Sequence, residues 1–165
     1  MSDLITLIRT DSNNADFRTL VALLDQDLAI RDGDDHAFYA QFNKVDAIKE
    51  VIVAYQDGTA IGCGAIKPFS ATAAEVKRMF VHPDYRKQGI AAKVLNTLEN
   101  WAAELGFSSC VLETGKKQPE AIGLYQKVGY HITPNYGQYI GVDNSVCMAK
   151  PLNPKRPAAN EYLFK

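Results

Sequence analysis

The stretch that decides the fold is Glu75-Val-Lys-Arg-Met-Phe-Val-His-Pro-Asp-Tyr-Arg-Lys-Gln-Gly-Ile-Ala-Ala92. It begins like a strand, continues as a basic loop with one glycine, Gly89, and ends where Ile90 starts an apolar stripe of helical period. The first turn of a helix has unpaired N–H groups and a partial positive charge, and Gly89 lets a ligand approach the backbone closely. This pattern predicts a phosphate or pyrophosphate site. A basic turn on a solvated surface is the alternative.

The segments around this stretch predict one mixed α/β domain over residues 1–150 and an extended, proline-containing tail over 151–165. Asp57-Gly58 lies between two apolar runs and predicts a hairpin, which argues against an all-parallel, doubly wound sheet. Strands are expected at 4–9, 48–56, 59–67, 74–81, 109–114, 130–134 and 145–150. Helices are expected from Asn13-Asn14 through Leu28, around 36–42, over 90–105 before Gly106, and from Pro119 to Gly129.

Composition excludes several classes of protein. The chain has 165 residues, 47% of them apolar and 22% charged, with a net charge of −1. These values are typical of a globular domain and provide no overall positive field for nucleic acid. No apolar run approaches the ~20 residues that span a bilayer, and residues 1–20 do not resemble a signal peptide. The expectation is a soluble, cytoplasmic protein with no nucleic-acid or membrane partner.

The three cysteines, Cys63, Cys110 and Cys147, are too few and too widely spaced to form a disulfide framework. The three histidines are equally scattered, so no metal site is expected. Buried or idle thiols in a reducing compartment are the favoured interpretation.

Two motifs resemble those of the GNAT acyltransferases. Arg86-Lys-Gln-Gly-Ile-Ala91 resembles the family signature R/Q-x-x-G-x-G/A, and Val76–Tyr85 matches the strand and loop that precede it. Ala121-Ile-Gly-Leu-Tyr-Gln-Lys-Val-Gly-Tyr130 resembles the second motif, A-x-x-L-Y-x-x-x-G-F/Y. The two motifs stand in the family's order, with a helix and a strand between them. A nucleotide P-loop and a dinucleotide fingerprint are both absent.

The resemblance implies an α+β fold with a splayed, mostly antiparallel sheet of about seven strands flanked by helices, and acetyl-CoA as co-substrate. The implied pyrophosphate site consists of Arg86 and the backbone N–H groups of Lys87, Gln88, Gly89, Ile90, Ala91 and Ala92. The implied pantetheine site is the backbone of Met79, Phe80 and Val81. Gln118 stands where family members often have Asn, and it could reach a pantetheine amide.

The reaction implied by the resemblance is direct transfer of an acetyl group to a primary amine. Glu75 could serve as the base, or it could be a surface carboxylate paired with Lys77. Tyr125 matches the family tyrosine that donates to the departing thiolate, although a core aromatic is the alternative. A backbone N–H near Met79 or Phe80 would take the developing oxyanion.

The acceptor is expected to be a primary amine of a small molecule or amino-acid-like substrate. A protein N-terminus or lysine is an alternative, and so is a CoA-binding module without turnover. The acids Asp25, Asp27, Asp32, Asp34 and Asp35 could form a rim that attracts a cation, or a solvated helix end. The tyrosines in the 134–141 connection could line a pocket, or belong to a plain hairpin loop. The chain is expected to be a monomer or a homodimer.

Overall fold

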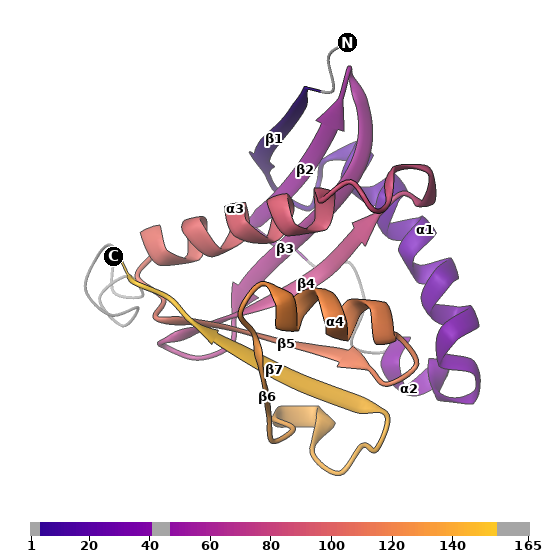
Figure 1. Cartoon of the computed structure of the whole chain (residues 1–165), viewed down its shortest axis with the longest axis vertical. Coiled ribbons are helices and arrows are strands. Elements are labelled where there is room, and N and C mark those ends of the chain that lie inside the picture. The colour runs from indigo at the N-terminus through magenta and orange to yellow at the C-terminus, as the bar shows by residue number, and fades with distance from the viewer. Residues whose placement is uncertain (1–3, 41–46, 155–165) are drawn as a thin grey trace. The chain divides into compact units, whose positions relative to one another are not determined.

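The computed structural model describes residues 4–40 and 47–154, with only the backbone of His36 and Ala40. Figure 1 shows its helices and strands in chain order. They are β1 Ile5–Thr10, α1 Ala15–Asp32, a 3₁₀ turn Gly33–Asp35, α2 His36–Ala40, β2 Glu50–Gln56, β3 Thr59–Pro68, β4 Ala73–Val81, a 3₁₀ turn Pro83–Tyr85, α3 Ile90–Glu104, β5 Ser109–Gly115, α4 Pro119–Lys127, β6 His131–Thr133, a 3₁₀ turn Gly137–Tyr139 and β7 Ser145–Pro151. The predicted helical piece at 36–42 is present as α2 as far as the description extends. Residues 155–165 of the predicted tail lie outside the described part.

The strands form one sheet in the order β1-β2-β3-β4-β5-β7-β6. The β2–β3 hairpin and the β1–β2, β5–β7 and β6–β7 pairs are antiparallel, and β4–β5 is parallel. The expected mixed, mostly antiparallel sheet is therefore confirmed. Among the described residues, no helix combines the length and apolar character needed to cross a bilayer.

Two compact units share this chain. The first comprises the described residues up to Lys67 together with Val76–Asn100, and the second comprises Pro68–Glu75 and the residues from Trp101 onward. β4 and α3 each contribute residues to both units.

The first unit is built on the packing of α1 against the sheet. Asn14 accepts a hydrogen bond from the Phe17 N–H at 2.9 Å and so caps the helix, as the sequence predicts. The helix continues one turn beyond Leu28 to Asp32, and Gly33, whose φ is 54°, follows it as the C-cap. The buried core joins apolar residues of α1 to those of the strands: Phe17, Leu20, Val21, Leu24, Val51, Val53, Cys63, Ala65 and Phe80.

Two glycines of β3 allow neighbouring elements of the first unit to approach closely. A Cβ at Gly64 would lie 2.5 Å from Met79 Sδ and 2.9 Å from Leu98 Cδ1. A Cβ at Gly62 would lie 3.1 Å from Ile90 Cγ2 and from the Phe80 carbonyl oxygen. These glycines therefore let α3 and the second half of β4 pack tightly on β3.

In the second unit, β7 pairs with both β5 and β6, and α4 contacts β5. The helix ends of this unit follow the sequence prediction, since Gly106 (φ 96°) follows α3 and Gly129 (φ 106°) follows α4. Cys110 and Cys147 are buried here, and Cys63 is buried in the first unit. All three thiols are thus buried, as expected, and in no disulfide.

Candidate functional site

The first unit presents a run of backbone N–H groups without protein partners. Arg86 N–H bonds to the Pro83 carbonyl, and the first helical bond of α3 runs from Lys93 N–H to the Gly89 carbonyl at 3.1 Å. Between these two bonds, no N–H from Lys87 to Ala92 has a hydrogen bond within residues 4–40 and 47–154. This is the segment that the sequence predicts as the pyrophosphate site.

The shape of this loop suits a bound anion. Lys87 and Gly89 have φ values of 65° and 78°, and alternation of this kind turns successive N–H groups toward one concavity. A Cβ at Gly89 would meet nothing within 4 Å, so the space beside it is open. The first turn of α3 contains no acid that would oppose a phosphate. The loop can therefore bind an anion through its backbone.

Arg86 lies back on the end of β4. Its Nε donates to the Val81 carbonyl oxygen at 2.8 Å, and its guanidinium lies 5.5 Å from the centre of the Phe80 ring. The remaining guanidinium N–H groups have no protein partner in the described part of the chain. Arg86 is thus held beside the loop with guanidinium N–H groups available to a ligand. The Val81 carbonyl, one of the backbone groups predicted to pair with pantetheine, is already used by Arg86.

β4 is available as a binding strand over its second half. Its parallel pairing with β5 covers only Ala73–Glu75. Beyond this point, Arg78 has a φ of 59°, an unusual value for a residue other than glycine, and it interrupts the extended backbone immediately before Met79. The predicted pantetheine residues, Met79–Val81, therefore follow a local deformation and lie past the end of the β4–β5 ladder.

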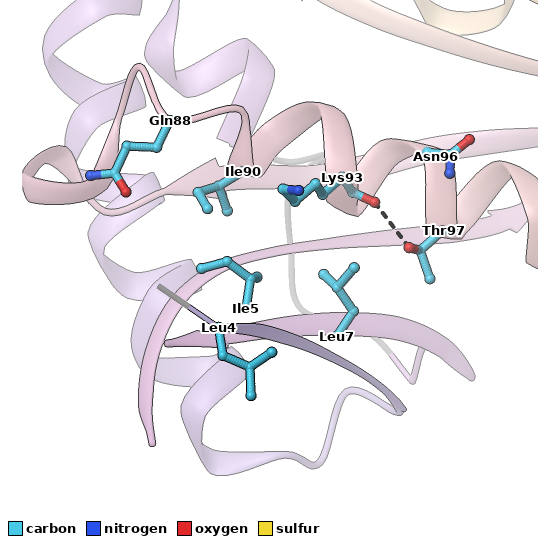
Figure 2. A pocket seen from close by; sticks show the side chains of 8 residues that line it. All are labelled: Leu4, Ile5, Leu7, Gln88, Ile90, Lys93, Asn96 and Thr97. Carbon is cyan, nitrogen blue, oxygen red and sulfur yellow. Dashed lines mark hydrogen bonds between the residues drawn. The ribbon is translucent and has the colours of Figure 1, made fainter. Parts of the chain in front are cut away.

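An open cavity of about 680 Å³ lies in the first unit, between β1 and the start of α3. Figure 2 shows Ile5 and Leu7 of β1 facing Ile90 and Lys93 of α3. The Thr97 hydroxyl donates to the Lys93 carbonyl oxygen at 2.9 Å. The cavity lining also includes Leu4, Gln88 and Asn96. The cavity thus combines the polar side chains of Gln88, Lys93 and Asn96 with the apolar side chains of β1 and its flank. The sequence analysis did not predict this cavity.

The second unit holds Glu75 in a specific contact. Only 6% of this residue is exposed, and its Oε2 accepts a hydrogen bond from the Tyr136 hydroxyl at 2.9 Å. The other oxygen, Oε1, has no hydrogen bond to any described residue. A buried carboxylate normally has its acceptors satisfied, so Oε1 offers a place for a water molecule or a ligand donor. The alternative that Glu75 is a surface carboxylate is wrong.

A second carboxylate, which the sequence analysis missed, shares this face of the sheet. Glu75 lies opposite Val111 of β5, and side chains alternate along a strand, so Glu113 is on the same face of β5 as Val111. Glu75 and Glu113 therefore lie on the same side of the sheet, as does Cys147, the β7 partner of Glu113. Burial raises the pKa values of the Tyr139 hydroxyl and the Cys147 thiol, and both carboxylates add to the rise. Burial likewise raises the pKa of Tyr136, with the charge of Glu75 as the second cause. The second unit thus combines two acids with protonated tyrosines.

Tyr125 is both a core aromatic and a potential donor. It is 8% exposed, and its ring meets Tyr130 edge to face with the centroids 5.8 Å apart. Its hydroxyl has no hydrogen bond to any residue of the described ranges. Burial raises its pKa, and the charge of Glu113 raises it further, so the phenol is protonated at neutral pH.

Gln118 precedes α4 as its N-cap, yet its side chain makes no capping hydrogen bond. The side-chain amide has no other partner in the described part of the chain. It is therefore available to a ligand amide, as the family resemblance implies.

Internal pairs take up part of the acidic segment at residues 25–35. Asp25 accepts from Arg78 at 2.6 Å, and Asp27 lies 3.3 Å from Arg31 one helical turn away. Asp32 is buried. Three of the five predicted rim acids thus have structural roles, which weakens the case for a cation-attracting rim.

The comparisons with known proteins agree on one family. The profile of the acetyltransferase (GNAT) family matches residues 16–130. An IAA acetyltransferase from Azospirillum brasilense is 40% identical over 102 residues, which cover 61% of this chain and 67% of that protein. The chain therefore belongs to the GNAT acetyltransferase family and is an acyltransferase.

Solved structures have the same fold. A Klebsiella pneumoniae protein assigned to the acyl-CoA N-acyltransferases superposes with a TM-score of 0.76 at 28% identity, covering 92% of this chain and 99% of that one. A GNAT acetyltransferase from Elizabethkingia anophelis, crystallised with acetyl-CoA, gives a TM-score of 0.63 at 19% identity, covering 92% and 100%. The second likeness extends to the fold alone.

Proposed function

We propose that this chain transfers the acetyl group of acetyl-CoA to a primary amine of a small molecule or amino-acid-like substrate by direct attack. The observation that carries this proposal is the buried Glu75, with one oxygen held by Tyr136 and the other without a protein partner. A carboxylate in this state can accept the proton that the attacking amine must lose, directly or through one water.

The residues for the co-substrate fit its chemistry. Acetyl-CoA supplies an activated acetyl thioester and carries its own pyrophosphate and amides. In the first unit, the N–H run from Lys87 to Ala92 and the guanidinium of Arg86 would bind the pyrophosphate, and the backbone of Met79–Val81 would pair with the pantetheine amides. In the second unit, Gln118 would bind an amide. Related folds have been crystallised with acetyl-CoA or CoA, which supports this assignment.

The two proton-handling residues have distinct roles. Glu75 takes a proton from the amine nitrogen as the new N–C bond forms. Tyr125 donates to the sulfur as the C–S bond breaks. Because its pKa is raised, the Tyr125 phenol acts as a protonated hydrogen-bond donor that stabilises the thiolate. A backbone N–H near Met79 or Phe80 would stabilise the oxyanion. The acceptor leaves as an amide and CoA as the thiolate, which takes a proton from water to become the thiol, while Glu75 returns its proton to water.

The test begins with calorimetric titration of acetyl-CoA and CoA, followed by an amine and peptide panel that is monitored by thiol release. Glu75→Gln should bind acetyl-CoA within about twofold of the wild type, but lose roughly 10²-fold or more in kcat/KM for the amine, as expected for loss of a general base. Glu50→Gln, a carboxylate of β2 outside the site, is the matched control and should retain activity.

Each unfavourable outcome identifies a different error. No binding of either CoA form would refute the co-substrate. Binding without turnover of any amine would favour a CoA-binding module. Turnover confined to peptides would replace the small-molecule acceptor, and full activity of Glu75→Gln would exclude that residue as the base.

A further inference from the structure

The connection between β6 and β7 is organised by one side chain, Asn135. Its amide nitrogen donates to the carbonyl oxygens of Tyr139, Val142 and Ser145, each at 3.1 Å. Two amide hydrogens shared among three carbonyls require at least one three-centre bond. The backbone closes the same segment with turns, from Tyr139 N–H to the Tyr136 carbonyl and from Val142 N–H to the Tyr139 carbonyl. This connection is therefore a clamped loop.

The clamped loop presents Tyr136 in a defined position. The Tyr136 ring lies 4.7 Å from the Phe69 ring and 5.9 Å from the Tyr139 ring, centre to centre. These two aromatic neighbours and the backbone anchored beside it at Asn135 restrict the Tyr136 ring. Its hydroxyl reaches Glu75 Oε2 across 61 positions of the sequence.

We infer that Tyr136 is a positioning residue for Glu75, held in place by the Asn135 clamp. The inference rests on the proposed function, in which Glu75 is the base. Glu75 shares its face of the sheet with another acid, Glu113, and lies near Tyr139 and Cys147. A donor on Oε2 stabilises the buried carboxylate in one orientation and leaves Oε1 for the amine or its water. Tyr136 therefore sets the direction in which the base acts without touching the substrate itself.

A double-mutant cycle tests this role. Tyr136→Phe removes only the hydroxyl and should lower kcat about tenfold or more, while KM for the amine and affinity for acetyl-CoA change less than about threefold. In the Glu75→Gln background, the same substitution should change kcat less than twofold, because Tyr136 acts through Glu75. Asn135→Ala should reproduce both results.

Tyr55→Phe is the matched control, because Tyr55 donates to Asp16 Oδ2 at 2.6 Å in the first unit. It removes the same type of tyrosine–carboxylate bond and should leave kcat unchanged. A tenfold loss from Tyr136→Phe in both backgrounds would make Tyr136 a structural residue and overturn the inference. An unchanged kcat when Tyr136→Phe is made in the otherwise wild-type protein would overturn it as well.

The assay of the wild-type protein distinguishes a failure of the positioning role from a failure of the proposed function. Absence of wild-type turnover refutes acetyl transfer itself, and the positioning role with it. Wild-type turnover with additive variants refutes only the role of Tyr136.

Discussion

Gly89 provides a sharp test of the anion site. The left-handed backbone conformation of Gly89 matters for folding, whereas its lack of a side chain matters for binding. Its φ of 78° lies in the left-handed region, and a Cβ there would project into open space. If a phosphate occupies that space, Gly89→Ala should affect both folding and binding. Gly58, in the β2–β3 turn, has a φ of 84° and equally open space, so Gly58→Ala is a matched control for folding alone.

The two effects have different sizes. A left-handed conformation costs a residue with a Cβ roughly 1–2 kcal/mol. In a protein of this length each kcal/mol lowers Tm by roughly 2–4 °C, so both variants should lose about 2–8 °C. A methyl group that displaces the phosphate from even one N–H of the loop removes a hydrogen bond to a charged group, worth about 1.5–3 kcal/mol. Gly89→Ala should therefore weaken acetyl-CoA binding roughly 10- to 100-fold.

Thermal unfolding and calorimetric titration of both variants measure the two effects. The expected result is a similar loss of Tm with a loss of affinity only at Gly89. Gly89→Glu should abolish binding, since it adds bulk and negative charge. If Gly89→Ala binds acetyl-CoA as tightly as Gly58→Ala and the wild type do, the loop is merely the start of a helix and the reasoning about phosphate is refuted.

Two further predictions concern buried groups. Tyr125→Phe should lower kcat about tenfold or more and change acetyl-CoA affinity less than twofold, measured by thiol release and calorimetry; a loss confined to affinity would leave Tyr125 as a core residue. Burial raises the pKa of the Cys63 thiol from 9.0 to about 12, so above pH 9 the unfolded chain loses a proton that the folded chain keeps, and stability falls by roughly 1.4 kcal/mol per pH unit. Urea unfolding between about pH 9.5 and pH 11 should show this slope, and Cys63→Ala should reduce it; equal slopes would contradict the buried thiol.

Local signals predicted most of the elements. Asn14 begins α1, Asp57-Gly58 turns the β2–β3 hairpin, and Gly106 follows α3, because capping and turn preferences depend on a few neighbouring residues. The loop from Arg86 to Ala92 was found for the same reason, as its glycine and basic residues are contiguous.

Contacts between distant positions gave no such signal. Tyr136 and Glu75 are 61 positions apart, and Arg78 and Asp25 are 53 apart. Counting acids around Asp25 gave only the alternatives of a cation-attracting rim and a solvated helix end, because the arginine that pairs with Asp25 belongs to another element. No motif in the sequence marks Asn135, since its three acceptors become neighbours only when the loop has closed.

Arg78 connects the deformation of β4 to the proposed chemistry. Its left-handed backbone costs roughly 1–2 kcal/mol, and its side chain is only 2% exposed, with Nε unpartnered within the described residues. A buried cation without a counter-charge is strongly destabilising, so Asp25 of α1 provides the partner at 2.6 Å. Strain of this kind persists only where its surroundings hold it. It falls between Glu75, the proposed base, and Met79, the start of the proposed pantetheine strand. A regular strand would continue its alternation through both positions, whereas this local deformation would let one strand serve the two proposed tasks on either side of Arg78.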